Sequence, residues 1–120
     1  MEQENQTRPA LPQQGPLSEL AALVDVTEQM LGLAKAGDWQ ALAELEQQRG
    51  PRLEAFFAGL DESQRERYSP ALRQTIEYIM GRDKQIMALG EATKTDALNS
   101  LRQSHSARQA TAAYRDNDKL

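Results

Sequence analysis

The sequence has 120 residues, of which 39% are hydrophobic and 27% are charged, and it contains no cysteine. A chain of this length forms one domain with a single core. The missing thiols exclude a disulfide framework, a thiolate zinc site and a cysteine nucleophile. The formal net charge is -4, with both signs interspersed along the chain. This balance argues against a nucleic-acid partner, because binding to phosphates requires a basic face.

No part of the sequence has the pattern of a membrane span or of a secretory signal. The apolar runs fall short of the roughly eighteen residues that a span requires. Residues 1–16 lack the basic start and apolar stretch of a signal peptide. We therefore expect no membrane insertion and a cytoplasmic location. The same residues are rich in Gln and Pro, which predicts a disordered N-terminal segment.

From Leu17 onward, apolar residues recur at three- and four-residue steps, which is the period of an α-helix. The first helix is expected over about residues 17–36. Gly37 is a good C-terminal stop, and Asp38 can cap the next helix with its side-chain oxygen. This short turn predicts that the first two helices are antiparallel neighbours.

The second helix is expected over about residues 38–60 and contains Gly50-Pro51. Proline removes one backbone donor and clashes with the preceding turn. The apolar register nevertheless continues through this dipeptide, so one kinked helix is favoured over two collinear pieces. Residues 61–68 are polar and charged and are expected to form a loop.

The third helix is expected over about residues 70–101, because Ser69-Pro70 is a standard helix start and no later proline follows. Residues 103–106 form a weak break, and residues 107–115 have the composition of a short helix that is marginal without a docking partner. The predicted fold is all-α: an antiparallel three-helix bundle over residues 17–101, with a kinked second helix and a long third helix. A tail over residues 102–120 would carry a short, detachable regulatory fourth helix.

The sequence holds no convergent set of reactive groups, so we predict no catalytic, metal or cofactor site. His105 is the single histidine and lies in a polar stretch, where a solvated side chain is the better interpretation. Asp83 falls on the same stripe as the isoleucines of the third helix. It is expected to bond across a helix–helix seam to Thr27 or Arg49. The alternative is an opening in the bundle where a partner enters.

Three stretches carry a resemblance to a known family: LAKAGDWQALAELEQQR, IMGRDKQIMAL and ARQATAAY. Their order and spacing resemble the FliT family of flagellar export chaperones, over most of residues 17–114. The resemblance implies binding to the C-terminal segment of the filament-cap protein FliD and engagement of the export ATPase complex. Some members of this family also inhibit a flagellar transcription activator, so the resemblance implies this role as well.

The mechanism expected from this resemblance is capture of a cargo helix in a groove between the second and third helices. Arg108 and Tyr114 of the tail would regulate access by competing for the same groove. Two alternatives remain. One is a structural coiled-coil protein without a client, including a homodimer, and the other is a regulator that sequesters a transcription activator. The residues expected to line the groove are Phe56, Phe57, Ile79, Met80, Ile86, Met87 and Leu89.

Overall fold

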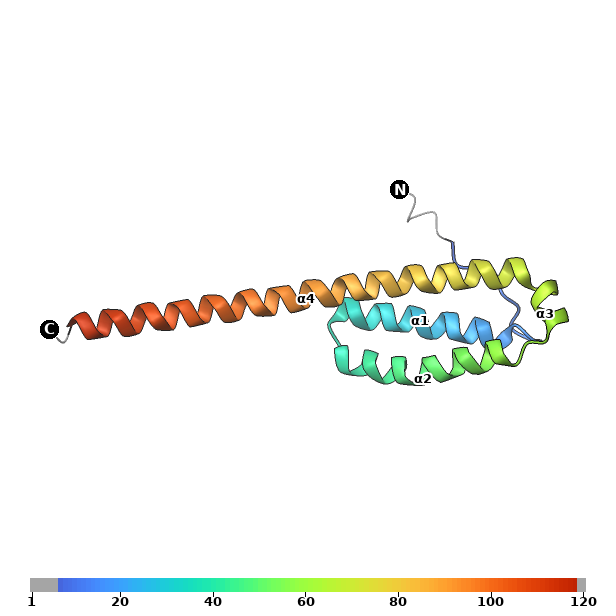
Figure 1. The fold of residues 1–120 in the computed structure, drawn as a ribbon, viewed down its shortest axis with the longest axis horizontal. Helices are drawn as coiled ribbons and strands as arrows, with labels where there is room; N and C mark the ends of the chain where they lie inside the picture. The colour runs from blue at the N-terminus through green and yellow to red at the C-terminus, as the bar shows by residue number, and fades with distance from the viewer. Residues whose placement is uncertain (1–6, 119–120) are drawn as a thin grey trace. The chain divides into compact units, whose positions relative to one another are not determined.

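The computed structural model describes the backbone of residues 7–118 and the side chains of residues 7–110. This part of the chain contains helices and no strand, so the predicted all-α class is confirmed. The chain divides into two compact units, residues 1–87 and residues 88–120. The helices, shown in Figure 1, are α1 (Ser18–Ala36), α2 (Trp39–Ala58), α3 (Glu62–Arg67) and α4 (Ser69–Asp118).

The helices α1 and α2 form a hairpin whose corner follows the sequence prediction. Gly37 has φ 78°, and its N–H donates to the Ala34 carbonyl. This left-handed conformation favours glycine, which has no Cβ to clash. The Asp38 side chain then accepts a hydrogen bond from the Ala41 N–H at 3.2 Å and caps α2. The two helices run side by side in opposite directions (Figure 1).

The second helix passes through Gly50-Pro51 without a break, so the prediction of one helix is confirmed and the alternative of two pieces is wrong. Pro51 leaves the Gln47 carbonyl without its usual helical donor. Both residues are exposed, so water can serve that carbonyl at little cost.

The segment expected to be a loop contains the short helix α3. Its start is a capping box, in which the Asp61 carboxylate accepts from the Gln64 N–H at 2.7 Å. The Gln64 side chain in turn accepts from the Asp61 N–H at 3.1 Å. Two backbone donors are thereby satisfied reciprocally, which stabilises a first turn even without an apolar face.

Two clusters of apolar side chains lie in the core of the first unit. Leu53 of α2 packs against both, so α1, α2 and the first part of α4 share one interior. The first core cluster comprises Leu17, Leu20, Leu60 and Leu72. The second core cluster comprises Val24, Tyr78 and Ile79.

Within this unit, each of the three long helices is connected to each of the other two by an arginine–carboxylate ion pair. Because each bond fixes two helices at a defined register, the pairs set how the helices align along their lengths. The pairs are Glu19–Arg52 between α1 and α2, Glu28–Arg82 between α1 and α4, and Arg49–Asp83 between α2 and α4.

The structure differs from the prediction of disorder over residues 7–16. Leu11 is half-buried and packs against both core clusters, and Arg8 forms an ion pair with Asp25 of α1. Composition missed these contacts because a single leucine and a single arginine make them. Residues 1–6 lie outside the described residues.

The predicted break at residues 103–106 is absent, and α4 is one helix from Ser69 to Asp118. These residues are polar but include neither proline nor glycine, and the His105 and Gln109 side chains contact each other one turn apart at 3.1 Å. The separate fourth helix expected at residues 107–115 is therefore part of α4. Residues 91–110 are exposed. Among the described residues, no helix is both long and apolar enough to cross a membrane.

Candidate partner-binding surface

The structure divides the seven predicted groove residues into three groups by exposure. Ile79 and Ile86 are only 6% and 8% exposed, so they belong to the core. Their assignment to an open groove is wrong. Successive helical residues are about 100° apart, so both isoleucines turn toward α1 and α2 while Met80 turns away.

Phe56, Phe57 and Leu89 form an intermediate group that is partly buried. The two phenylalanines pack against the first core cluster, and their ring centroids lie 5.1 Å apart in an edge-to-face arrangement. This geometry is favourable for aromatic pairs. Leu89 lies in the second unit.

Met80 and Met87 are exposed, at 54% and 68%, and Ile76 shares their face with 39% exposure. Steps of four and seven residues place these three side chains within a narrow arc of the helix. We call them the α4 apolar row. Exposed large apolar side chains arranged in a row are typical of a surface that binds another protein, and methionine adapts its shape to different partners.

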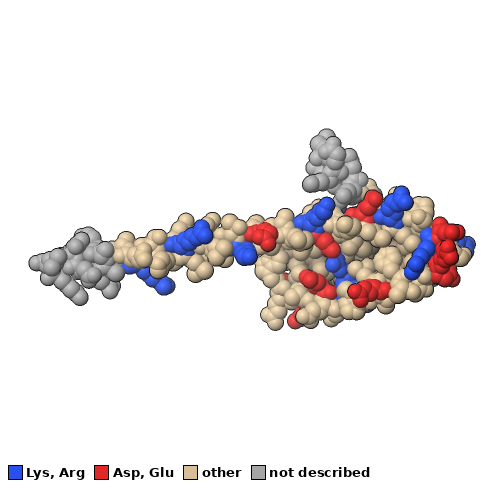
Figure 2. All heavy atoms as spheres, in the orientation of Figure 1, with Lys and Arg blue, Asp and Glu red and all other residues tan. Residues whose placement is uncertain are grey.

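A hollow of about 460 Å³ adjoins this row at Ile76, near the junction of α3 and α4. Leu72 and Ile76 give it an apolar lining, while arginines and one carboxylate stand around them. Figure 2 shows charges of both signs interspersed over the visible face of the first unit. The lining residues are Arg65, Ser69, Leu72, Arg73, Ile76 and Glu77.

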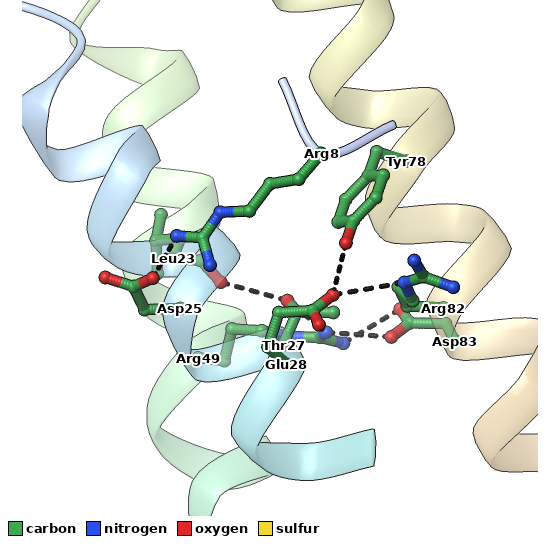
Figure 3. Close-up of polar contacts among 9 residues, drawn as sticks. All are labelled: Arg8, Leu23, Asp25, Thr27, Glu28, Arg49, Tyr78, Arg82 and Asp83. Carbon is green, nitrogen blue, oxygen red and sulfur yellow. Dashed lines mark hydrogen bonds and ion pairs between the residues drawn. The ribbon is translucent and has the colours of Figure 1, made fainter. Parts of the chain in front are cut away.

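Asp83 lies beside the α4 apolar row and has the partners expected from the sequence. Arg49 donates two hydrogen bonds to its carboxylate, at 2.8 and 2.9 Å (Figure 3). The Arg49 Nη1 also donates to the Thr27 hydroxyl at 3.1 Å, and that hydroxyl donates to the Leu23 carbonyl at 2.9 Å. The seam interpretation of Asp83 is confirmed, and the carboxylate is engaged within the bundle.

A second polar cluster joins α1 and α4. Its residues Glu28 and Arg82 are the sequence neighbours of Thr27 and Asp83 in the first cluster. The Tyr78 hydroxyl donates to Glu28 at 2.5 Å, and the Arg82 Nε donates to the same carboxylate oxygen at 3.0 Å. The Arg82 guanidinium lies 4.6 Å from the centre of the Tyr78 ring, within the range of a cation–π contact. Burial, reinforced by the Glu28 carboxylate, raises the pKa of Tyr78, while Arg82 opposes this shift.

These two clusters were only partly visible in the sequence. Helical periodicity placed Asp83 on the inward face of α4. It gave no such indication for Glu28 and Arg82, whose long side chains reach the seam between the helices from its edge. Tyr78 and Arg82 are four residues apart on one helix, and this spacing was the available signal. Together the clusters fix α4 against α1 and α2, and so fix the direction in which the adjacent α4 apolar row faces.

The tail residues are placed less completely. Arg108 is exposed on α4. The side chain of Tyr114 lies outside the described residues. Within the described part of the chain, no group of three or more histidines, cysteines or carboxylates could hold a metal ion.

Comparison with protein families identifies the chain. The model of the family described as flagellar protein FliT matches residues 17–116. The chain belongs to the FliT family. The match covers all of α1, α2 and α3 and nearly all of α4, and it begins after the segment that carries Arg8 and Leu11. Comparison with curated proteins and with solved structures gives no match.

Proposed function

We propose that this FliT-family protein is a flagellar export chaperone, and that the α4 apolar row binds the C-terminal segment of the filament-cap protein FliD. The observation that carries the proposal is the exposure of Ile76, Met80 and Met87 on a helix whose other face is anchored in the core. A cargo helix with apolar residues at matching steps would cover this row, with the edges of Phe56 and Phe57 extending the contact.

The size of the row indicates a reversible complex. Full burial of one large apolar side chain contributes about 1.5–3 kcal/mol, and these three are already partly buried. Ordering the cargo segment offsets part of the gain. Affinity in the micromolar range, about -8 kcal/mol, therefore requires additional contacts, for which the hollow at Ile76 is the nearest surface. Weak binding suits a chaperone that must release its cargo to an export apparatus.

Competition by the tail for the α4 apolar row requires a conformational change in α4. For residues 102–120 to compete for the row on the same chain, the helix must open near residues 103–106, where the side chains are polar. Deleting residues 102–120 should then raise the affinity for cargo. Unchanged or weaker binding would contradict competition by the tail. Engagement of the export ATPase complex and of a transcription activator are further parts of this proposal.

A structural coiled-coil protein is the second candidate, and exposed Leu98 and Leu101 of the second unit favour it. It predicts self-association that buries these leucines between copies. Sedimentation velocity from about 5 to 500 μM separates the two, because a mass that rises with concentration toward the dimer supports assembly.

The proposed function is tested by calorimetric titration of the full chain with the C-terminal segment of FliD from the same bacterium. A saturable one-to-one complex is expected. A folded chain that takes up no FliD segment would overturn the proposal.

A further inference from the structure

The N-terminal segment occupies a surface on the side of α4 opposite the apolar row. Leu11 packs against both core clusters, which brings it against α1 near Val24 and against the first turns of α4. Three residues earlier, Arg8 forms its ion pair with Asp25 (Figure 3). We call the surface beneath these two side chains the Leu11 site.

The Leu11 site combines an apolar floor with an acidic edge. The hydrogen bond to Asp25 is the main cause that raises the pKa of Arg8, and the charge of Glu28 adds to it. A guanidinium is therefore favoured at this edge. The floor accepts one large aliphatic side chain, and the backbone between Arg8 and Leu11 forms neither helix nor turn.

The ion pair of the present occupant is weak. The Arg8 and Asp25 side chains are 45% and 51% exposed, and ion pairs this exposed contribute little. Open hollows of about 360 and 540 Å³ flank the segment, on the sides of α1 and α4. The connection to α1 turns at Gly15, which has φ 88°. A separate peptide with the same side chains can therefore compete for the surface.

We propose that the Leu11 site is a second binding site, which takes a non-helical peptide with an arginine three residues before a leucine, and that the chain's own residues 8–11 are its resident occupant. The site is separate from the α4 apolar row, because Tyr78 lies about 200° around the helix from Ile76. The inference does not depend on the identity of the flagellar cargo.

The test uses the full chain and a synthetic peptide of residues 7–14, TRPALPQQ, followed by amide NMR. In the Leu11→Ser variant the signals of Val24, Asp25 and Tyr78 should shift, while the chain remains folded. Added peptide should return these signals toward their wild-type positions with a saturable dependence. It should bind this variant about fivefold or more tightly than the wild type, whose site is already occupied.

Matched controls separate this proposal from a purely structural role for Leu11. Gln14 is exposed and lines neither hollow, so Gln14→Ser should leave the signals unchanged. Peptides carrying Leu11→Ser or Arg8→Glu should not restore them. The proposal is overturned if the wild-type peptide leaves the variant's spectrum unchanged at millimolar concentration, or if both chains bind it equally. Shifts that depend on protein concentration would assign the site to a second copy and also overturn it.

Discussion

Arg49 of α2 and Asp83 of α4 form a bidentate pair in which both carboxylate oxygens accept a guanidinium hydrogen bond, at 2.8 and 2.9 Å. The Arg49 side chain is 11% exposed, and its Nε is buried without a partner. The cation therefore relies on Asp83 and Thr27 for its remaining interactions. Removing one member leaves a desolvated charge, whereas removing both leaves none.

We expect Asp83→Leu to lower the free energy of unfolding by about 2–4 kcal/mol, because Arg49 would then be buried unpaired. The double variant Arg49→Met/Asp83→Leu should recover most of this loss. Urea unfolding of the two variants and the wild type measures the difference. As a control, Glu19→Gln weakens the exposed pair with Arg52 and should cost less than about 1 kcal/mol. Equal losses for the single and the double variant would contradict the account.

Thr27 and Thr75 provide a matched pair for the second acceptor of Arg49. Both are 0% exposed, and both hydroxyls donate to a backbone carbonyl four residues earlier. Thr27 additionally accepts from Arg49. Thr27→Val should therefore cost about 1–2 kcal/mol more than Thr75→Val, since it leaves a charged donor unsatisfied. Equal costs, measured by urea unfolding, would show that the Arg49 bond contributes nothing.

Tyr78 predicts a loss of stability at alkaline pH. Burial and the Glu28 carboxylate raise its pKa above the ordinary value of 10.0. A raised pKa contributes stability that is fully present below pH 10 and is lost as the pH rises through the folded value. The free energy of unfolding should therefore decline above about pH 10, and Tyr78→Phe should make this decline shallower. Urea titrations between pH 8 and pH 11.5 measure the slope, with Tyr68→Phe as the control. An unchanged slope in Tyr78→Phe would contradict the assignment.

Truncation of two neighbouring residues on α4 should change the stability of the chain by very different amounts. Ile79→Ala removes a core side chain and should cost about 2–4 kcal/mol. Met80→Ala removes an exposed one and should change stability by less than about 0.5 kcal/mol. Thermal unfolding of both variants checks the contrast. A large loss for Met80→Ala would mean that the α4 apolar row packs against the bundle rather than serving a partner.

Much of the fold was predictable because local signals decide it. The Gly37-Asp38 corner, the helix through Gly50-Pro51 and the partners of Asp83 all follow from capping chemistry and helical periodicity. The short helix α3 was missed, because its capping box, Asp61 with Gln64, precedes no apolar run. The continuity of α4 through residues 103–106 was not predicted, although polar residues without proline or glycine can continue a helix.

The candidate site was less predictable. Periodicity shows that α4 has a wide apolar face, but not which part of that face the other helices cover. Ile79 and Met80 are adjacent and equally apolar in the sequence, and only packing separates them. The contacts of Arg8 and Leu11 were invisible for a related reason, since single side chains in a Gln- and Pro-rich segment carry no period.

The central claim is that the α4 apolar row binds the FliD segment, and one comparison tests it most directly. The full chain, its Met80→Gln/Met87→Gln variant and its Leu98→Gln/Leu101→Gln variant are titrated calorimetrically with the same FliD segment. Both variants exchange exposed apolar residues of α4 for glutamine, so they match in chemistry. The account predicts that the Met80/Met87 variant binds about tenfold or more weakly, a loss of about 1.4 kcal/mol or more, while the Leu98/Leu101 variant binds like the wild type. Undiminished binding by the Met80/Met87 variant would contradict it.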